Sequence, residues 1–389
     1  MHVCLVSVEL FAWGKYGGFG RATRTIGREL ARCGVQVSAV VPRRSGQAEV
    51  ESLDGITVYG FTRTAPWKAA ELFRRIDADV YHSQEPSWGT RVAMRAAPDR
   101  KHVITFRDTR TTRDWQIELA HPSHSRLQVL ANLVYEDNPL VHRSIRRADA
   151  LFCASEHLAA KAMRKYRLTG MPTFLPTPVE VPAEIRKSPE PTVCYNGRWD
   201  RRKRPELFFE LAAALPDVRF VAFGGSRDAA WEAGLTRRYG RLPNLEMLGF
   251  VDQFASSRVS EVLERSWVLV NTSLREGLPN AFLEASAHGC ALLSAVDPDG
   301  FASRFGEHAS SDDFVSGLRR LLAGDRWRAL GERGREYVRR RFATEVAVER
   351  HIEAYARVLT PRAVSPATPA RVPSAPRTAK RLGAPVPVS

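Results

Sequence analysis

The chain has 389 residues, which is too many for one typical hydrophobic core, so we expect two domains. Hydrophobic residues make up 44% and charged residues 26%, as in ordinary globular proteins, and no apolar run of about 18 residues predicts a membrane-spanning helix. The 5 cysteines are scattered and never in C-x-x-C spacing, which argues against a disulfide framework or a zinc site and favours a cytoplasmic protein.

The formal net charge of +15 limits the classes of partner. A basic surface suits an anionic membrane, an acidic substrate or nucleic acid. No nucleic-acid recognition motif accompanies the charge, so nucleic acid is the weakest of these alternatives and is not expected as a partner. Arginines spread along the chain are equally typical of a compositional bias. Peripheral contact with the inner face of a membrane is therefore a hypothesis beside a purely cytoplasmic location.

Short apolar runs alternate with helix-length amphipathic segments along the chain. A first series of strands is expected at 3–10, 35–41, 78–84, 102–106 and 149–155, and a second at 192–197, 218–225, 267–273 and 291–296. This alternation predicts parallel sheets built from βα units. The first run contains Glu9 and follows no basic region, so it predicts a strand and not a signal peptide. After it, apolar residues recur at helical spacing until Gly34 ends the helix.

A proline-rich segment at 171–192 separates the two series, because proline at this density cannot continue helices or central strands. We therefore predict two doubly wound, Rossmann-like α/β domains that face a central cleft. The first spans 1–180 and the second 190–342. Residues 343–360 form a closing helix that can cross back to the first domain. Residues 361–389, rich in proline and basic residues, are expected to be disordered.

The first strand–helix junction, at 13–25, is rich in glycine. Gly17 and Gly18 allow backbone N–H groups to approach a bound group, and the following helix N-terminus favours an anion. A dinucleotide fingerprint is incomplete, because Thr23 replaces its third glycine and 40–46 lacks the acidic residue that binds a ribose. Arginines in 40–46 suit a 2′-phosphate, so an NADP-dependent oxidoreductase is one alternative. A merely tight turn explains the glycines equally well.

Basic residues follow the first strand of the second domain. Arg198 lies just past the strand end, and Lys203 precedes a helix whose first turn Pro205 favours. Two cations and a helix N-terminus at one strand end predict an anion site suited to a diphosphate. The alternative is a solvent-exposed basic run, which we predict for Arg201, Arg202 and Arg204.

Two glutamates, Glu276 and Glu284, lie in the mostly apolar segment REGLPNAFLEASAHG at 275–289. Glu276 is expected in the turn after a strand. Glu284 is expected one turn into a helix that begins at Pro279 or the next residue and ends at Gly289. Both carboxylates are thereby placed near one strand end of the second sheet.

A carboxylate that is buried at Glu284 needs hydrogen-bond donors to offset the cost of removing its charge from water. A ribose diol supplies two such donors, while the amides of Gly277 and Leu278 suit a sugar or phosphate oxygen. The alternative, which the residues alone favour equally, is that Glu284 pairs with a neighbouring arginine.

The pattern EGLPNAFLE at 276–284 resembles the E-x7-E motif of retaining glycosyltransferases of the GT-B fold, specifically family 4. Further segments carry the same resemblance over almost the whole chain before the tail: 17–18, 148–166, 197–203, 244–251 and 267–277. The resemblance implies transfer of a sugar from a nucleotide-diphosphate sugar, without a metal ion or other cofactor, to a glycan, lipid or small-molecule acceptor. The donor base, the donor sugar, the acceptor and the oligomeric state stay open.

The resemblance also implies a role for each matching residue. Glu284 holds the ribose hydroxyls, and Glu276 orients the donor sugar without acting as a nucleophile. Arg198 and Lys203 clamp the diphosphate, and such preorganised cations lower the barrier to its departure. The leaving phosphate then helps to deprotonate the acceptor. The other donor-binding positions are Gly17, Gly18, Phe250, Val251, Gly277, Leu278 and Pro279, with backbone groups at Phe250 and Val251 facing the base.

One segment departs from the family pattern. The run TFRD at 105–108 places Arg107 where many family members have a histidine, and arginine cannot act as a base. Arg107 is suited to stabilise a phosphate or an acidic acceptor, helped by Asp108 or by a histidine: His82, His121 or His124. Residues 107–140, with Trp115 and Tyr135, are expected to shape the acceptor pocket. The departure keeps a non-catalytic nucleotide-sugar-binding relative as an alternative.

Two D-x-D triplets, at 77–79 and 297–299, are similar to metal-binding triplets of transferases with a different fold. Neither triplet follows a nucleotide-binding half-domain, and such short patterns arise easily by chance. We interpret both as turns and expect no metal site.

Overall fold

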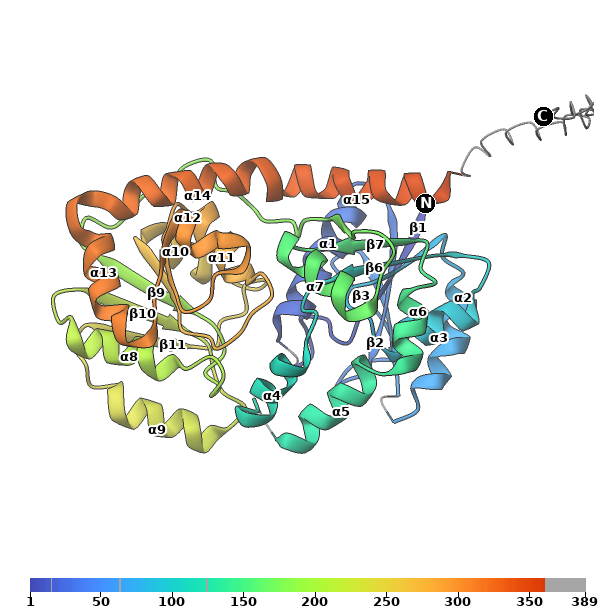
Figure 1. Ribbon diagram of the computed structural model, residues 1–389, viewed down its shortest axis with the longest axis horizontal. Helices are drawn as coiled ribbons and strands as arrows, with labels where there is room; N and C mark the ends of the chain where they lie inside the picture. Colours follow the sequence, from blue (N-terminus) through green and yellow to red (C-terminus); the bar gives the residue numbers. More distant parts are fainter. Residues whose placement is uncertain (15, 63, 124, 361–389) are drawn as a thin grey trace, which may run out of the picture. The chain divides into compact units, whose positions relative to one another are not determined.

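The computed structural model describes residues 1–360 apart from residues 15, 63 and 124. The tail predicted at 361–389 and the candidate His124 therefore lie outside the described residues. Within the described part, the chain forms two β-sheets with helices packed against them (Figure 1).

The first sheet has eight strands among the described residues, in the order β3-β4-β2-β1-β5-β6-β7-β8. All neighbouring strands are parallel except β3, which is antiparallel to β4. The order reverses between β1 and β5, which makes that point the switch point of the sheet. The strands are β1 (His2–Val6), β2 (Gln36–Pro42), β3 (Val50–Leu53), β4 (Ile56–Phe61), β5 (Val80–Ser83), β6 (Lys101–Phe106), β7 (Ala150–Cys153) and β8 (Thr173–Phe174).

The second sheet has six strands in the described chain, in the order β11-β10-β9-β12-β13-β14, and its neighbours are all parallel. This is the strand order of a doubly wound Rossmann sheet, with its switch point between β9 and β12. The predicted fold class is therefore confirmed. The strands are β9 (Thr192–Asn196), β10 (Arg219–Phe223), β11 (Leu245–Gly249), β12 (Val268–Asn271), β13 (Ala291–Ser294) and β14 (Gly306–His308).

Helices follow most strands. Those associated with the first sheet are α1 (Gly18–Arg32), η1 (Pro66–Lys68), α2 (Ala69–Ile76), α3 (Trp88–Ala96), α4 (Thr112–Ala120), α5 (Arg126–Glu136), α6 (Pro139–Ile145) and α7 (Glu156–Tyr166). Those that follow β9 are α8 (Pro205–Ala214), α9 (Ala229–Tyr239), α10 (Arg258–Arg265), α11 (Asn280–Ala287), η2 (Pro298–Gly300), α12 (Phe301–Phe305), η3 (Ser311–Asp313), α13 (Phe314–Leu322), η4 (Ala323–Asp325), α14 (Arg326–Phe342) and α15 (Thr344–Leu359). None of the helices in the described chain combines the length and apolarity needed to cross a bilayer.

The second sheet is buried on both faces. Along β9, Val193 and Tyr195 share a core cluster with Phe208 of α8, whereas Cys194 between them shares a different cluster with Phe282 of α11. Successive side chains of a strand point to opposite faces, so both faces must be covered by helices. This arrangement leaves the strand ends as the places where polar residues can gather.

The last described helix, α15, packs on the first sheet. Tyr355 and Val348 share a core cluster with Val3 of β1. The Tyr355 hydroxyl lies 2.7 Å from Nδ1 of His82, and burial lowers the pKa of this histidine well below its usual value. Figure 1 shows α14 and α15 one after the other along the top of the molecule. The predicted domain boundaries stay predictions, but His82 is a buried packing residue.

The triplet at 297–299 forms a tight turn, in which the Gly300 N–H donates to the Asp297 carbonyl at 3.2 Å, and the triplet at 77–79 connects α2 to β5. Asp77 ends α2 with φ 46°, and Asp299 has φ 57° in η2. Asp299 Oδ1 accepts the His157 amide at 2.7 Å, so this carboxylate holds the start of α7. No three or more His, Cys, Asp or Glu side chains of the described chain are grouped so that they could hold a metal ion.

Candidate functional site

The carboxyl ends of β9 and β12 bring two of the predicted donor-site residues together. Lys203 lies between β9 and α8, and Glu276 lies between β12 and α11. Lys203 Nζ forms an ion pair with Glu276 Oε1, and the two side chains are 17% and 11% exposed. Burial opposes ionisation of Glu276, but Lys203 and Arg202 outweigh it and hold the pKa of the carboxyl below its usual value. Glu276 is therefore ionised at neutral pH.

Arg198 lies at the same strand end. Its Nη2 is 3.3 Å from Oδ2 of Asp200, and its side chain is 38% exposed. Asp200 also accepts the backbone N–H of Lys203 at 3.0 Å through Oδ1. One buried carboxylate therefore binds the Arg198 guanidinium and the Lys203 backbone, and the Arg198 side chain stays partly exposed.

The prediction of a solvent-exposed basic run was wrong for two of its three residues. Arg202 is 7% exposed and donates from Nη1 to a backbone carbonyl of the β12–α11 loop at 3.2 Å. Arg204 is half-buried and donates from Nε to the carbonyl oxygen of Thr272 at 2.7 Å. Arg201 is exposed, as predicted, and pairs with Asp228 at 3.1 Å. In the tight turn between β9 and α8, neighbouring arginines point into different surroundings, one toward solvent and the next into the protein. Composition does not reveal this difference.

Glu284 lies one turn into α11, as predicted. Its Oε2 is 3.1 Å from Nη1 of Arg21 and 3.5 Å from Nδ2 of Asn196. Burial raises the pKa of this carboxyl, although Arg21 opposes the shift. An arginine partner was one of the two predicted alternatives. The sequence did not indicate that this arginine belongs to α1, the helix that follows the glycine loop.

The start of α11 has the predicted geometry. Pro279 is the N-cap residue of the helix, and Gly289 follows its end with φ +70°. Gly277 is packed so tightly that a Cβ on it would overlap a backbone carbonyl oxygen of the loop after β6. Leu278 is half-buried against the core of the second sheet. The loop that carries Glu276 is thus packed against the loop after β6 through Gly277 and against the core of the second sheet through Leu278.

The two glycines of the first junction differ in their surroundings. Gly17 is the N-cap residue of α1, and a Cβ on it would overlap Oε1 of Glu9. The same oxygen accepts the N–H of Gly20 at 3.1 Å. Gly18 has more room, and its carbonyl oxygen accepts a hydrogen bond from Nδ2 of Asn280 at 3.0 Å. A side chain at position 17 would therefore have to displace the Glu9 carboxylate, and Gly18 contacts the start of α11.

Arg107 is buried behind the loop after β6, at 6% exposed. Its Nε and Nη2 donate to Oε1 of Gln84 at 3.0 and 2.7 Å, and its Nη1 donates to the hydroxyl of Thr177 at 2.8 Å. Burial lowers its pKa to about 10, so the guanidinium stays charged at neutral pH. The Arg107 carbonyl is the group that leaves no room for a side chain at Gly277.

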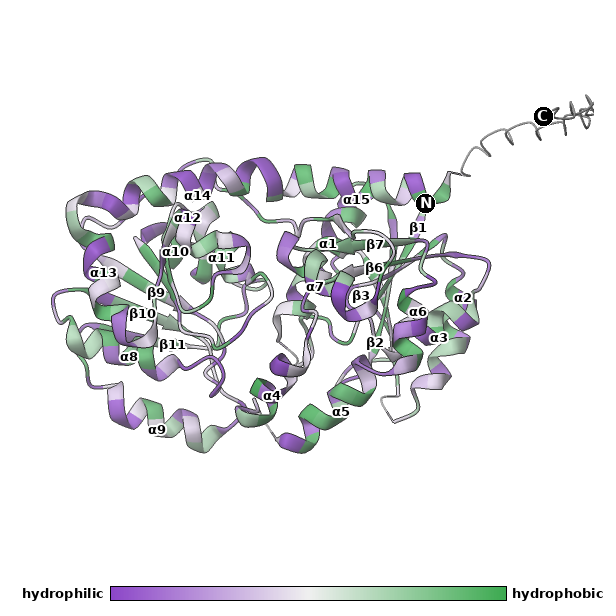
Figure 2. Ribbon diagram, viewed as in Figure 1, coloured by the Kyte–Doolittle hydropathy of each residue, from purple (hydrophilic) through white to green (hydrophobic). Residues whose placement is uncertain are grey.

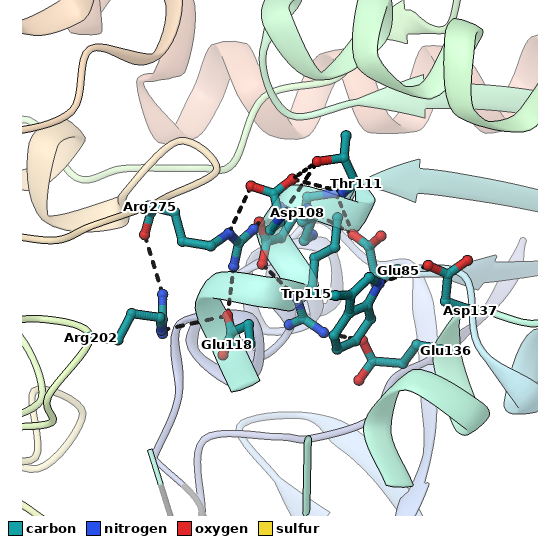
Figure 3. Close-up of polar contacts among 12 residues, drawn as sticks. Glu85, Asp108, Thr111, Trp115, Glu118, Glu136, Asp137, Arg202 and Arg275 are labelled. Carbon is teal, nitrogen blue, oxygen red and sulfur yellow. Dashed lines mark hydrogen bonds and ion pairs between the residues drawn. The ribbon is translucent and has the colours of Figure 1, made fainter. Parts of the chain in front are cut away.

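An ionic network joins the loop after β12 to the loop after β6 and to α4 (Figure 3). Arg275 pairs with Asp108 through Nη2, with Asp114 through Nε at 3.2 Å and with Glu118 through Nη1 at 2.7 Å. The Arg275 side chain is 5% exposed. Arg202 Nε lies 3.5 Å from the same Glu118 oxygen. Two buried arginines, each next to a predicted donor-site residue, are thus paired with three carboxylates; we call these five residues the Arg275 network.

A second set of pairs continues from Asp108 toward α5. Arg110 lies 3.2 Å from Asp108 and 2.6 Å from Glu136, and its guanidinium covers the Trp115 ring at 4.7 Å. Trp115 Nε1 donates to Asp137 at 2.7 Å. Trp115 therefore belongs to the packing beneath α4. Sequence reasoning missed these pairs and those of Arg275, although Asp114 and Glu118, four residues apart on α4, were a usable signal for a cation on that helix face.

Phe250 lies just after β11 and is 50% exposed. Its ring stacks on Tyr16 of the glycine loop, with centroids 4.5 Å apart. Phe11 contacts both rings, at 4.9 Å from Tyr16 and 6.3 Å from Phe250. The sequence indicated only a backbone role for Phe250 and the half-buried Val251. The structure adds an aromatic contact between the segment after β11 and the glycine loop.

Two family models match the sequence. The model described as Glycosyltransferase Family 4 matches residues 16–181, and the model described as Glycosyl transferases group 1 matches residues 180–336. Together these two matches span most of the chain. Among curated proteins, no sequence matches.

Solved structures are similar over nearly the whole chain. Sucrose-phosphate synthase from Thermosynechococcus elongatus has a TM-score of 0.70 and 18% identity, with 92% of this chain and 98% of that chain covered. Anabaena HepE in complex with UDP-glucose has a TM-score of 0.66 and 13% identity, with 91% and 99% covered. The catalytic domain of starch synthase IV from Arabidopsis thaliana, bound to ADP and acarbose, has a TM-score of 0.63 and 12% identity, with 92% and 99% covered. At these identities the likeness shows the shared fold.

Proposed function

We propose that Arg198, Lys203 and Glu276 bind the diphosphate and the sugar of a nucleotide-sugar donor. The chain belongs to the family 4 glycosyltransferases of the GT-B fold. The chain is a retaining, metal-independent enzyme that transfers a sugar from a nucleotide sugar. One observation carries the proposed site. The Lys203–Glu276 pair lies at the carboxyl ends of β9 and β12, the switch point where doubly wound sheets bind ligands.

The two cations act on the leaving group. Breaking the bond between sugar and diphosphate leaves negative charge on the phosphate, and preorganised cations stabilise that charge as it develops. The Lys203 ammonium has three N–H donors, so it can keep Glu276 and also donate to a phosphate oxygen. Glu276, ionised at neutral pH, accepts hydrogen bonds from sugar hydroxyls and orients the ring. The leaving phosphate helps to take the proton of the acceptor hydroxyl.

Glu284 serves the nucleotide part of the donor. A carboxylate offers about four acceptor positions, so two ribose hydroxyls can bind beside Arg21 and Asn196. The amides of Gly277 and Leu278 face a sugar or phosphate oxygen in this proposal, and Pro279 sets the direction of α11 behind them. Backbone groups at 250–251 face the base, and the loop at 17–18 approaches the phosphates or the acceptor.

Arg107 is proposed as a positioning residue. Its side chain is engaged by Gln84 and Thr177, and its carbonyl fixes Gly277 next to Glu276. Because an arginine cannot act as a base, Arg107 leaves a second candidate function, a relative that binds nucleotide sugars without turnover. The family assignment gives no support to the oxidoreductase alternative.

The acceptor is proposed to be a glycan, a lipid or a small molecule. HepE and starch synthase IV were solved with UDP-glucose and ADP, so nucleoside diphosphates are the donor fragments to test first. The net charge of +15 supports peripheral contact with an anionic membrane, and the scattered cysteines support a cytoplasmic enzyme.

Calorimetric titration with UDP, GDP, ADP and dTDP in excess EDTA tests the donor site. We expect one nucleotide to bind, and Lys203→Met and Glu284→Gln each to weaken it by about tenfold or more, because each removes a charged partner. Arg201→Met is the matched control, since this exposed arginine lies in the same turn and its contacts are with Asp228 and the Trp231 ring. Its affinity should stay within about twofold of wild type.

Two results would count against the proposal. Equal losses of nucleotide affinity in Lys203→Met and Arg201→Met would show that any nearby positive charge has the same effect, and that Lys203 makes no specific contact. If no nucleoside diphosphate binds, and no intact nucleotide sugar binds either, the proposed donor site is wrong. If intact donors bind, slow release of free sugar separates the enzyme from the binding relative, which releases none.

A further inference from the structure

The exposed face of α5 is apolar. Leu127 is 79% exposed, Leu130 45% and Val134 69%. These residues recur at helical spacing, so their side chains form one stripe along the helix. A surface helix normally turns such a stripe toward the core, but the side chain that α5 buries is Val129. Figure 2 colours much of α5 as hydrophobic. The stripe therefore needs a partner outside the described chain.

The segment of the chain that carries this stripe is basic. Five exposed arginines lie on or next to α4, α5 and α6: Arg113, Arg126, Arg143, Arg146 and Arg147. Between residues 112 and 147, no exposed residue that the structure describes is acidic. The carboxylates of this stretch are drawn into ion pairs, as Asp137 is with Lys165 at 2.6 Å. We call the three apolar residues and five arginines the α5 surface.

We propose that the α5 surface docks on an anionic lipid bilayer. A helix that presents leucine and valine between basic residues can lie in the head-group region, with its apolar side chains at the acyl boundary. Arginines at the flanks reach the lipid phosphates with their long side chains. Each adds electrostatic attraction to an anionic leaflet. The proposal specifies the membrane contact of the proposed function, and it does not depend on the donor residues.

A second copy of this chain is the competing partner. In a two-fold dimer the same surface faces itself, so the basic residues of the two copies would oppose one another. The stripe also occupies a single helix of 11 residues, whereas stable interfaces bury about 800 Å² on each partner. Complementary charge therefore favours the anionic bilayer.

The position of α5 links docking to the transfer reaction. α5 contacts α4, and α4 carries Asp114 and Glu118, which bind Arg275 next to Glu276. A docked α5 thus places the proposed acceptor side of the enzyme close to the head groups. If the proposed function holds, an acceptor that is presented by the membrane reaches the enzyme without leaving the bilayer.

Vesicle flotation with the full chain tests the docking. Vesicles of phosphatidylcholine with phosphatidylglycerol are compared with pure phosphatidylcholine at low salt. We expect the wild-type protein to bind the anionic vesicles. Binding should weaken by about tenfold or more in Leu127→Asp/Val134→Asp and in Arg143→Ser/Arg146→Ser/Arg147→Ser. The matched controls are Met171→Asp, an apolar residue that is 63% exposed, and Arg237→Ser/Arg241→Ser/Arg319→Ser, with the same change in net charge.

Each outcome decides the proposal. No binding to anionic vesicles, or equal losses in the α5 variants and their controls, would overturn it, because the contact would then be absent or lie elsewhere. Sedimentation that shows a wild-type dimer broken by Leu127→Asp/Val134→Asp would assign the surface to a second copy. Thermal unfolding of each variant verifies that it is folded, and these exposed positions should change it little. Nucleotide titration of the same variants should match wild type, so a failed donor site and a failed docking surface give different results.

Discussion

The strand ends of the second sheet and the loop after β6 with α4 use charged residues in opposite ways. At the second sheet, Lys203 and Glu276 form one ion pair, and Arg198 presents a partly exposed fork. In the Arg275 network, Asp108 and the α4 carboxylates are all bound to buried arginines. The strand ends of the second sheet keep hydrogen-bond donors and acceptors that a ligand can use, whereas the charged groups of the Arg275 network are paired with one another.

The comparison shows that sequence neighbours divide between the two regions. Arg202 belongs to the Arg275 network, while Lys203 beside it pairs with Glu276. Likewise, Arg275 is bound by the loop after β6 and α4, while Glu276 beside it faces the proposed donor. Two arginines therefore anchor the two loops that carry the proposed donor residues. In the proposed function the network positions the site and takes no part in its chemistry.

The largest expected effect is on Arg275. Arg275→Met leaves three carboxylates without their shared partner inside the protein, and removing one partner of a buried ionic group costs about 3–5 kcal/mol. We expect the free energy of unfolding, measured in urea, to fall by that amount. The affinity for the nucleotide should fall as well, because Glu276 loses its anchored neighbour.

Arg201→Met serves as the control for this prediction. Arg201 forms its ion pair on the surface, where water screens the interaction, so the free energy of unfolding should be nearly unchanged. Equal stabilities of Arg275→Met and wild type would show that the network is not a structural anchor, and the contrast between the two regions would then disappear.

Glu85 gives the network a pH dependence. Its Oε2 accepts the N–H groups of Arg107 at 2.6 Å and Asp108 at 2.9 Å, and burial raises its pKa from 4.5 to about 7. Between these two values the folded state binds more protons than the unfolded state, so the free energy of unfolding falls as pH rises. The fall amounts to about 3 kcal/mol, since one pKa unit corresponds to about 1.4 kcal/mol.

Glu85→Gln keeps an oxygen for both N–H groups and cannot ionise. Urea unfolding between pH 4.5 and pH 8 should therefore show wild type losing stability relative to this variant as pH rises through that window. Parallel pH profiles of the two proteins would mean that Glu85 titrates normally, and that the first-sheet side of the network is open to water.

Much of the fold was predictable because burial on both faces leaves continuous apolar runs. The alternation of such runs with helices indicated two doubly wound sheets, and the structure confirms them. The edge hairpin β3–β4 was missed, because β3 is largely exposed and its alternating residues resemble a loop. Its turn was nevertheless encoded: Asp54 and Gly55 have φ 51° and 82°, as an Asp-Gly hairpin turn requires.

The candidate site was predictable only where it is local. Lys203 and Glu276 follow strand ends, and Glu284 follows a recognisable helix start, so short patterns place each of them. The partners of Arg275 and Glu284 lie far away in the chain: Arg275 and Asp108 are 167 positions apart. No local pattern encodes such a pairing, because it depends on how separate elements pack.

Gly277 tests the contact between the two regions directly. A Cβ at this position would overlap the carbonyl oxygen of Arg107, which is backbone and cannot rotate away. We expect Gly277→Ala to lower the free energy of unfolding by about 1–3 kcal/mol, as overpacking does, and to weaken nucleotide binding by displacing Glu276. Gly234→Ala in α9 is the control, because nothing lies within 4 Å of its Cβ and alanine favours a helix. Equal behaviour of the two variants would mean that the loops separate readily.

The smallest expected effect concerns Ser123, which lies between α4 and α5. Its hydroxyl donates to Oδ2 of Asp200 at 2.8 Å, and Asp200 also holds Arg198 and the Lys203 amide. Ser123→Ala should cost about 1 kcal/mol of unfolding free energy, the value of one hydrogen bond, because Asp200 keeps its other partners. Nucleotide affinity should stay within about twofold of wild type. A much larger loss of affinity would mean that the α4–α5 segment shapes the donor site itself. Asp200 and its partner Ser123 would then belong to the ligand-binding region, and not to the anchoring region.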